Sequence, residues 1–254
     1  MTALLIAHNT FREATRDRMV AGLLGAGALL LVATQIIGPL ALGEDSRLTV
    51  DLGLSGISIL GFLMVLLVGT SLVAKEVERR TIYNLLSRPI SRHGYLIGKW
   101  LGLVAALWLV AVCLGMGLGV LMLVNGAGGQ IPAIAQAVYL AALELAVMTS
   151  IAVLFSALST PALSALYTLG VFVVGQWSYD LRAFAAEFPD SLRALVGWIA
   201  NVAPNLPIFN MRTLAAGGEL TSFAHLGLAS LYALVYCICI LGLASAAFES
   251  REFK

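Results

Sequence analysis

The chain has 254 residues, of which 60% are hydrophobic and only 11% are charged, and its mean hydropathy is +0.94. These values exclude a soluble globular domain and are typical of a membrane protein with several spans. The net charge of +1 gives no reason to expect a nucleic-acid-binding surface, and the length suffices for roughly six spans of about 20 residues each.

The first 18 residues predict an amphipathic helix that lies at the membrane surface. One face of this helix carries a stripe of apolar and small residues, and the arginines and acidic residues lie mostly on the other faces. This stripe consists of Leu4, Leu5, Ala7, His8, Phe11, Ala14 and Thr15. A short solvated tail is the alternative. A cleavable signal peptide does not fit, because the apolar run behind the arginines is too long.

Six apolar stretches predict an all-α polytopic membrane protein with one transmembrane domain over residues 1–254. We expect the spans at about 19–42, 52–74, 100–124, 131–158, 162–177 and 223–248. A charged loop over 43–51 separates the first two spans. In the third span Gly115 and Gly119 form a G-x-x-x-G pair that favours tight helix packing. Thr160 followed by Pro161 predicts the start of the fifth span.

Residues 75–99, between the second and third spans, hold six of the fifteen Lys and Arg residues. Thr81 can cap a short helix whose apolar face contains Ile82, Leu85 and Leu86, and Pro89 would end it. Charged residues flank both ends of this helix. An apolar face with charged ends suits docking into a groove of a soluble partner, and it also suits anionic lipid headgroups.

The fourth span contains Glu144, the one acidic residue well inside a span. Because a charge is costly there, we expect its side chain to face a cavity, a neighbouring helix or a subunit interface. It could contact a polar substrate or exchange a proton. The alternative is a structural hydrogen bond, to Thr149, Ser150 or a residue of another helix.

Residues 178–222 form the longest segment that contains polar residues, with Pro204 and Pro207 among its three prolines. We expect short helices that dip into the membrane interface and gate an exit or dock a partner on that side. A solvated connector is the alternative. The three cysteines and three histidines are scattered, so no catalytic group and no metal site is predicted.

The positive charges predict the orientation of the chain in the membrane. Eleven Lys and Arg residues lie on the side of the termini, and four, namely Arg47, Arg182, Arg193 and Arg212, lie on the other side. The positive-inside rule therefore predicts that both termini and the 75–99 loop are cytoplasmic, in a multi-pass protein of the cell (inner) membrane.

The 75–99 loop resembles the signature loop of type 2 ABC exporter permeases. The resemblance lies in Glu76-Val-Glu-Arg-Arg-Thr81, Leu85-Leu-Ser-Arg-Pro-Ile-Ser-Arg92 and Gly98-Lys99. Arg80 stands where that family usually has glycine. The Thr-Ile-Tyr sequence at 81–83 is closest to permeases of multicopper-enzyme and nitrous-oxide reductase maturation.

This resemblance implies an exporter with two copies of a six-span permease and two separate ATP-binding cassette subunits. The loop would be the coupling helix that docks on the ATPase. By position, the docking residues are Glu76, Glu78, Arg79, Arg80, Thr81, Ile82, Leu85, Leu86, Arg88 and Arg92. ATP and Mg²⁺ would bind the partner, because the chain has no phosphate-binding Gly-x-x-x-x-Gly-Lys-Ser/Thr loop and no cofactor of its own is expected.

Two other functions remain open. The chain could be a mechanical transmitter that passes ATPase motion to an extracytoplasmic partner while no cargo crosses. It could also be an ATP-independent, proton-linked carrier or channel that uses Glu144, although a proton relay usually needs more than one titratable group. The sequence does not identify the cargo.

Overall fold

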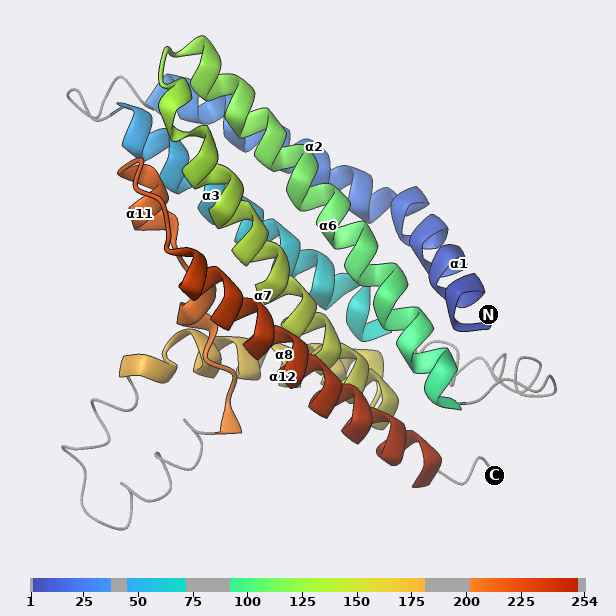
Figure 1. The fold of residues 1–254 in the computed structure, drawn as a ribbon. Helices are drawn as coiled ribbons and strands as arrows, with labels where there is room; N and C mark the ends of the chain where they lie inside the picture. The colour runs from blue at the N-terminus through green and yellow to red at the C-terminus, as the bar shows by residue number, and fades with distance from the viewer. Residues whose placement is uncertain (1, 38–44, 72–91, 181–201, 251–254) are drawn as a thin grey trace.

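The computed structural model describes residues 2–37, 45–71, 92–180 and 202–250, and all regular structure within these ranges is helical (Figure 1). The α-helices are α1 (Thr2–Arg16), α2 (Arg18–Ile37), α3 (Asp45–Leu67), α6 (Arg92–Val124), α7 (Ile131–Leu158), α8 (Pro161–Gln176), α11 (Arg212–Ala216) and α12 (Phe223–Ser250). Short 3₁₀ turns are η2 (Gly69–Ser71), η3 (Gly128–Gln130) and η4 (Leu206–Phe209). The predicted all-α class is therefore confirmed for the described residues.

Five of the six predicted spans form helices that are long and apolar enough to cross a membrane. They cover Arg18–Ile37, Asp45–Ser71, His93–Val124, Gly128–Leu158 and Phe223–Phe248. The remaining predicted span, 162–177, forms α8, which is apolar but has only 16 residues. A helix of that length is about 24 Å long, which is shorter than the hydrocarbon core of about 30 Å. A sixth crossing therefore stays a prediction.

Two predicted boundaries are wrong because helices continue beyond the apolar residues. The expected loop at 43–51 is helical from Asp45 onward, as the first turns of α3. The last residues of the 75–99 loop, from Arg92 to Lys99, are the first turns of α6. Hydropathy marks where a helix leaves the hydrocarbon, and a helix can continue past that point with polar residues.

Helix α7 is the centre of the bundle. In the most apolar stretch of α7, 83% of the residues are buried, whereas in the corresponding stretches of α2 and α12 only 22% are buried. It packs against α3, α6, α8, α11 and α12. The stacked rings of Phe62 and Phe172, with centroids 3.7 Å apart, join α3 to α8. A helix that is apolar on all sides is expected at such a central position.

The turn before α8 begins as predicted, with Thr160 as N-cap residue and Pro161 in the first turn. The Thr160 side chain makes no capping hydrogen bond, however. Instead, Ser164 Oγ donates to the Phe155 carbonyl at 2.8 Å and lies 2.9 Å from Ser159 Oγ. The Phe155 carbonyl also accepts the Ser159 backbone N–H and Ser159 Oγ, both at 2.9 Å, so the two serines cap the end of α7 and Ser164 joins it to α8.

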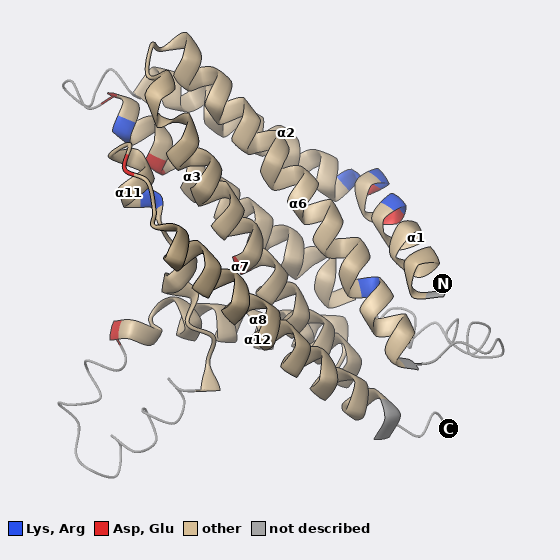
Figure 2. Cartoon of the chain, in the orientation of Figure 1, with Lys and Arg blue, Asp and Glu red and all other residues tan. Residues whose placement is uncertain are grey.

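The two ends of the described chain lie at the same end of the bundle, and α6 also begins there (Figure 1). Lys, Arg, Asp and Glu residues gather near the two ends of the bundle, and the helices between them carry almost none (Figure 2). This distribution fits a helix bundle whose middle lies in a bilayer and whose two ends are in contact with water.

Candidate functional site

Most of the predicted coupling helix lies outside the described residues. This holds for Glu76, Glu78, Arg79, Arg80, Thr81, Ile82, Leu85, Leu86 and Arg88. Arg92 is the first residue of α6. The structure therefore describes only the elements on either side of this segment, which are η2 and the start of α6.

Helix α1 packs directly against the start of α6, at the end of the signature loop. A Cβ atom on Gly98 would lie 2.7 Å from the Ala3 carbonyl oxygen and 2.9 Å from Ile6 Cβ. One turn further, a Cβ on Gly102 would collide with the Ala7 carbonyl oxygen and lie 2.6 Å from Thr10 Cβ. Glycine is required at both positions for the two helices to come this close.

The contact face of α1 differs from the predicted stripe. Ala14 and Thr10 are buried, Ile6 and Phe11 pack against the core, and Leu4 and Leu5 are 70% and 66% exposed. The prediction of an amphipathic helix is thus right in kind, but its apolar face turns toward α6, and the two leucines at its tip face outward.

Lys99, the last residue of the signature loop, is buried beside α1. Its Nζ atom lies 3.9 Å from Glu13 Oε2 and 6.0 Å from the centre of the Tyr95 ring. The Glu13 side chain is 74% exposed, so the ion pair itself adds little stability. The stem of Lys99 contributes mainly by packing between α1 and α6.

Glu144 lies inside the bundle on α7, where its side chain is 5% exposed. Gln176 Nε2, at the C-terminal end of α8, donates a hydrogen bond to Glu144 Oε1 at 2.6 Å. Thr149 and Ser150, two of the partners considered from the sequence, bond carbonyls of their own helix instead. The carboxyl group therefore joins α7 to α8.

Arg212, the first residue of α11, makes a second set of polar contacts between helices. Its guanidinium donates to Asn210 Oδ1 at 2.9 Å and to Ser55 Oγ on α3 at 2.7 Å. These bonds fix α11 against α3. Two polar contacts thus connect helices within the apolar bundle: Glu144–Gln176 joins α7 to α8, and Arg212–Ser55 joins α11 to α3.

The described part of the 178–222 segment packs into the bundle. Leu206 and Phe209 are 0% and 2% exposed. The Asn205 backbone N–H donates to Tyr232 Oη at 2.8 Å, and His225 Nε2 lies 2.9 Å from the Ile208 carbonyl oxygen. The short helices expected here are present as η4 and α11. Residues 202–217 are therefore not a solvated connector.

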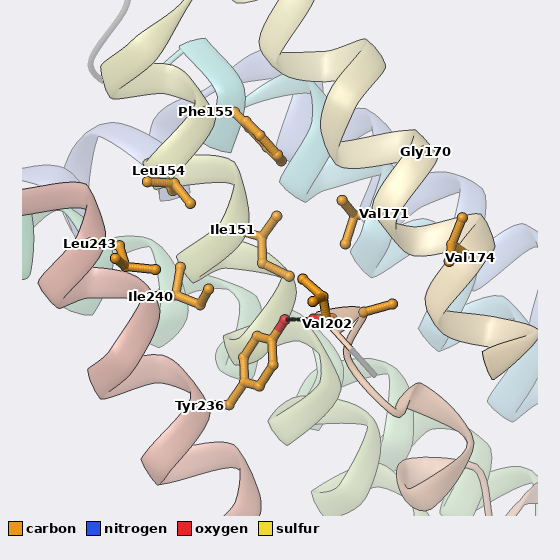
Figure 3. Close-up of a pocket in the computed structure, with 11 residues that line it drawn as sticks. Ile151, Leu154, Phe155, Gly170, Val171, Val174, Val202, Tyr236, Ile240 and Leu243 are labelled. Atoms are coloured by element: carbon orange, nitrogen blue, oxygen red, sulfur yellow. Dashed lines mark hydrogen bonds between the residues drawn. The ribbon is translucent and has the colours of Figure 1, made fainter. Parts of the chain in front are cut away.

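An apolar pocket of about 370 Å³ lies between α7, α8 and α12 (Figure 3). Its walls include Ile151, Phe155, Val171 and Ile240. The Tyr236 hydroxyl group, at its edge, donates to the Val202 carbonyl at 3.4 Å. Because the Tyr236 hydroxyl group is already hydrogen-bonded, the pocket suits an apolar ligand group and has no partner for a charged ligand group.

Among the described residues, no group of His, Cys, Asp and Glu side chains could hold a metal ion. Cys113 and Cys239 are exposed and Cys237 is buried, and none of them forms a disulfide. The described residues thus contain two notable features: the contact of α1 with the start of α6, and the buried Glu144–Gln176 pair.

The fold defines a helical protein in which, among the described residues, five helices are long and apolar enough to cross a membrane. The profile of the ABC-2 family transporter protein matches residues 4–252, which is nearly the whole chain. The chain belongs to this family of ABC transporter membrane subunits, and the resemblance to type 2 ABC permeases is confirmed. Membership implies pairing with an ATP-binding cassette subunit. A search of curated proteins found no match.

Proposed function

We propose that the chain is the permease of an ATP-driven exporter, in which two copies assemble with two ATPase subunits that dock on residues 75–99. Both termini and this loop would be cytoplasmic, and ATP and Mg²⁺ would bind the ATPase. The observation that carries the proposal is the family match over residues 4–252 together with the signature loop.

The packing of α1 on α6 supports a mechanical role for this loop. Residues 92–99 complete the signature loop and are already helical. A push on the loop therefore acts on a helix of 33 residues, which is about 50 Å long and crosses the bundle. Because α1 contacts the backbone of α6 at Gly98 and Gly102, we expect the two helices to move together as one rigid body.

The docking site can be tested by charge reversal. The double variant Arg79→Glu, Arg80→Glu and the single variant Leu85→Asn should lower both co-purification of the ATPase and permease-dependent ATP hydrolysis. We expect a loss of at least about tenfold, which corresponds to about 1.4 kcal/mol of binding free energy. Arg193→Glu, predicted on the other side of the membrane, is the matched control and should leave both properties unchanged.

Wild-type co-purification and hydrolysis in both loop variants would contradict docking on this loop. A chain that purifies without an ATPase and moves protons in vesicles would instead be a carrier. The variant Glu144→Gln distinguishes a proton carrier from an ATP-driven permease. A proton carrier would lose its proton flux, whereas an ATP-driven permease would keep its ATPase coupling. A complex that couples ATP hydrolysis to an outer partner without cargo movement would be the mechanical transmitter.

A further inference from the structure

A second apolar groove runs along the contact between α6 and α7, and no charged residue lines it. It has a volume of about 500 Å³ and extends from Trp108 and Ala142 to Leu123 and Ile131. The last two residues flank the turn that joins α6 to α7. This turn lies at the end of the bundle opposite the chain termini (Figure 1). The groove thus starts at that membrane surface and ends within the bundle.

The dimensions of the groove fit one hydrocarbon chain. Its lining spans residues 131–142 of α7, about 16 Å at a rise of about 1.5 Å per residue, and residues 108–123 of α6, about 22 Å. One leaflet contributes about 15 Å of hydrocarbon, half of about 30 Å. Over these lengths, a volume of about 500 Å³ makes a narrow groove. An α-helix, about 10 Å wide, is much too thick to lie inside it.

The groove offers no free hydrogen-bonding group. Trp108 Nε1 donates to the Ala142 carbonyl at 2.8 Å. Tyr139 Oη lies 2.8 Å from Ser230 Oγ. Both polar side chains of the lining are thus satisfied within the chain, and the occupant needs no polar group of its own along this length.

Two glycines give the groove its shape. A Cβ on Gly115 would lie 2.8 Å from Val138 Cγ2, so Gly115 brings α6 and α7 together at the floor. A Cβ on Gly119, one turn further, would meet nothing within 4 Å. The exposed side chains of Met116 and Val120 stand beside this opening. The missing side chain at Gly119 therefore leaves space that helix packing does not use.

We propose that this groove binds one acyl chain of a phospholipid from the leaflet opposite the chain termini. The proposal depends on the membrane-spanning arrangement and on the shape of the groove, and not on the pairing with an ATPase. A lipid chain is the occupant that matches the length, the narrow cross-section and the absence of unsatisfied polar groups.

The test is photo-crosslinking in vesicles of phosphatidylcholine in which one acyl chain carries a diazirine. We expect residues 115–123 to be labelled more than the exposed face of α12 around Leu231, which is 58% exposed. Gly119→Leu should remove this excess labelling, because its side chain fills the groove without a clash. Gly227→Leu, at an equally open glycine on α12, is the matched control and should retain it.

Ala135→Leu fills the groove from α7 and provides the same test if Gly119→Leu does not fold. Labelling of residues 115–123 at the level of α12, or labelling that both filling variants leave unchanged, would overturn the proposal. A second copy of the chain in the groove would also overturn it. This would appear as disulfide-linked dimers of Met116→Cys in a chain without its native cysteines.

Discussion

At the end of the bundle that carries the termini, α1 lies against the backbone of α6 at Gly98 and Gly102. Residues 202–217 begin where Val202 and Ala203 line the pocket of Figure 3, and they end in α11 at the opposite end of the bundle (Figure 1). They are held by the buried side chains of Leu206 and Phe209 and by hydrogen bonds from single side chains. The first contact is helix against helix over several turns. The second joins a segment with little regular structure to α3, α7, α8 and α12.

The difference concerns how each end can respond to force. Two helices in backbone contact cannot shift past one another by small steps, because their closely packed atoms would collide. A segment held by separate hydrogen bonds, each worth about 1 kcal/mol, can release one bond at a time. We therefore expect the α1–α6 pair to be rigid and residues 202–217 to be the adjustable end.

The largest effect is expected for Phe209→Ala. Phe209 is 2% exposed, and its ring centroid lies 6.0 Å from that of Tyr232. Removing the ring leaves a cavity and should cost about 3 kcal/mol of unfolding free energy. Hydrogen exchange should rise in residues 202–217 and stay unchanged in α1.

The matched control for Phe209→Ala is Phe223→Ala, because Phe223 is 84% exposed. Thermal unfolding in detergent should separate the two variants clearly. If exchange in α1 rises as much as in residues 202–217, the two ends are one cooperative unit, and the distinction between them fails.

The next effect is expected for Gly102→Ala. The added Cβ would collide with the Ala7 carbonyl oxygen, so α1 must move away from α6. Overpacking of this kind costs about 1 to 3 kcal/mol. Gly25→Ala is the control, because a Cβ there meets nothing within 4 Å. Hydrogen exchange in α1 should rise in the first variant only, and equal protection in both would show that α1 is not held by close contact.

Tyr232→Phe should have a smaller effect, because it removes one hydroxyl group from the adjustable end. The Asn205 N–H, which donates to Tyr232 Oη at 2.8 Å, then loses its partner. We expect a loss of about 1 to 2 kcal/mol. Tyr179→Phe is the control, because Tyr179 is 74% exposed. A Tyr232→Phe protein with the unfolding temperature of its control would mean that this bond does not hold the segment.

The sequence predicts the spans better than the contacts between them. Hydropathy identifies the spans because the bilayer demands apolar residues over a fixed length. It does not identify where a helix ends in water, which is why Asp45–Asp51 and Arg92–Lys99 were expected as loops. A G-x-x-x-G spacing occurs at both Gly98/Gly102 and Gly115/Gly119, but both glycines of the first pair meet a neighbouring helix, whereas only Gly115 of the second pair does.

The partner of Glu144 could be predicted only as a class. A hydrogen bond within the bundle follows from the cost of a buried carboxyl group. The identity of Gln176 depends on how α7 and α8 cross, and the two residues are 32 positions apart. The coupling residues from Glu76 to Arg88 lie outside the described structure, so their role rests on the signature motif and on the family match.

The smallest effect is expected for Glu13→Gln at the rigid end. Its carboxylate lies 3.9 Å from Lys99 Nζ, but the Glu13 side chain is 74% exposed. Water and salt screen such a pair, so we expect a loss of at most about 1 kcal/mol. Thermal unfolding at low and high ionic strength measures it, and any difference between the variant and wild type should vanish in high salt. Because backbone contact at Gly98 and Gly102 remains, exchange in α1 should not change. A large, salt-resistant loss would show that charge, and not close packing, holds α1 on α6.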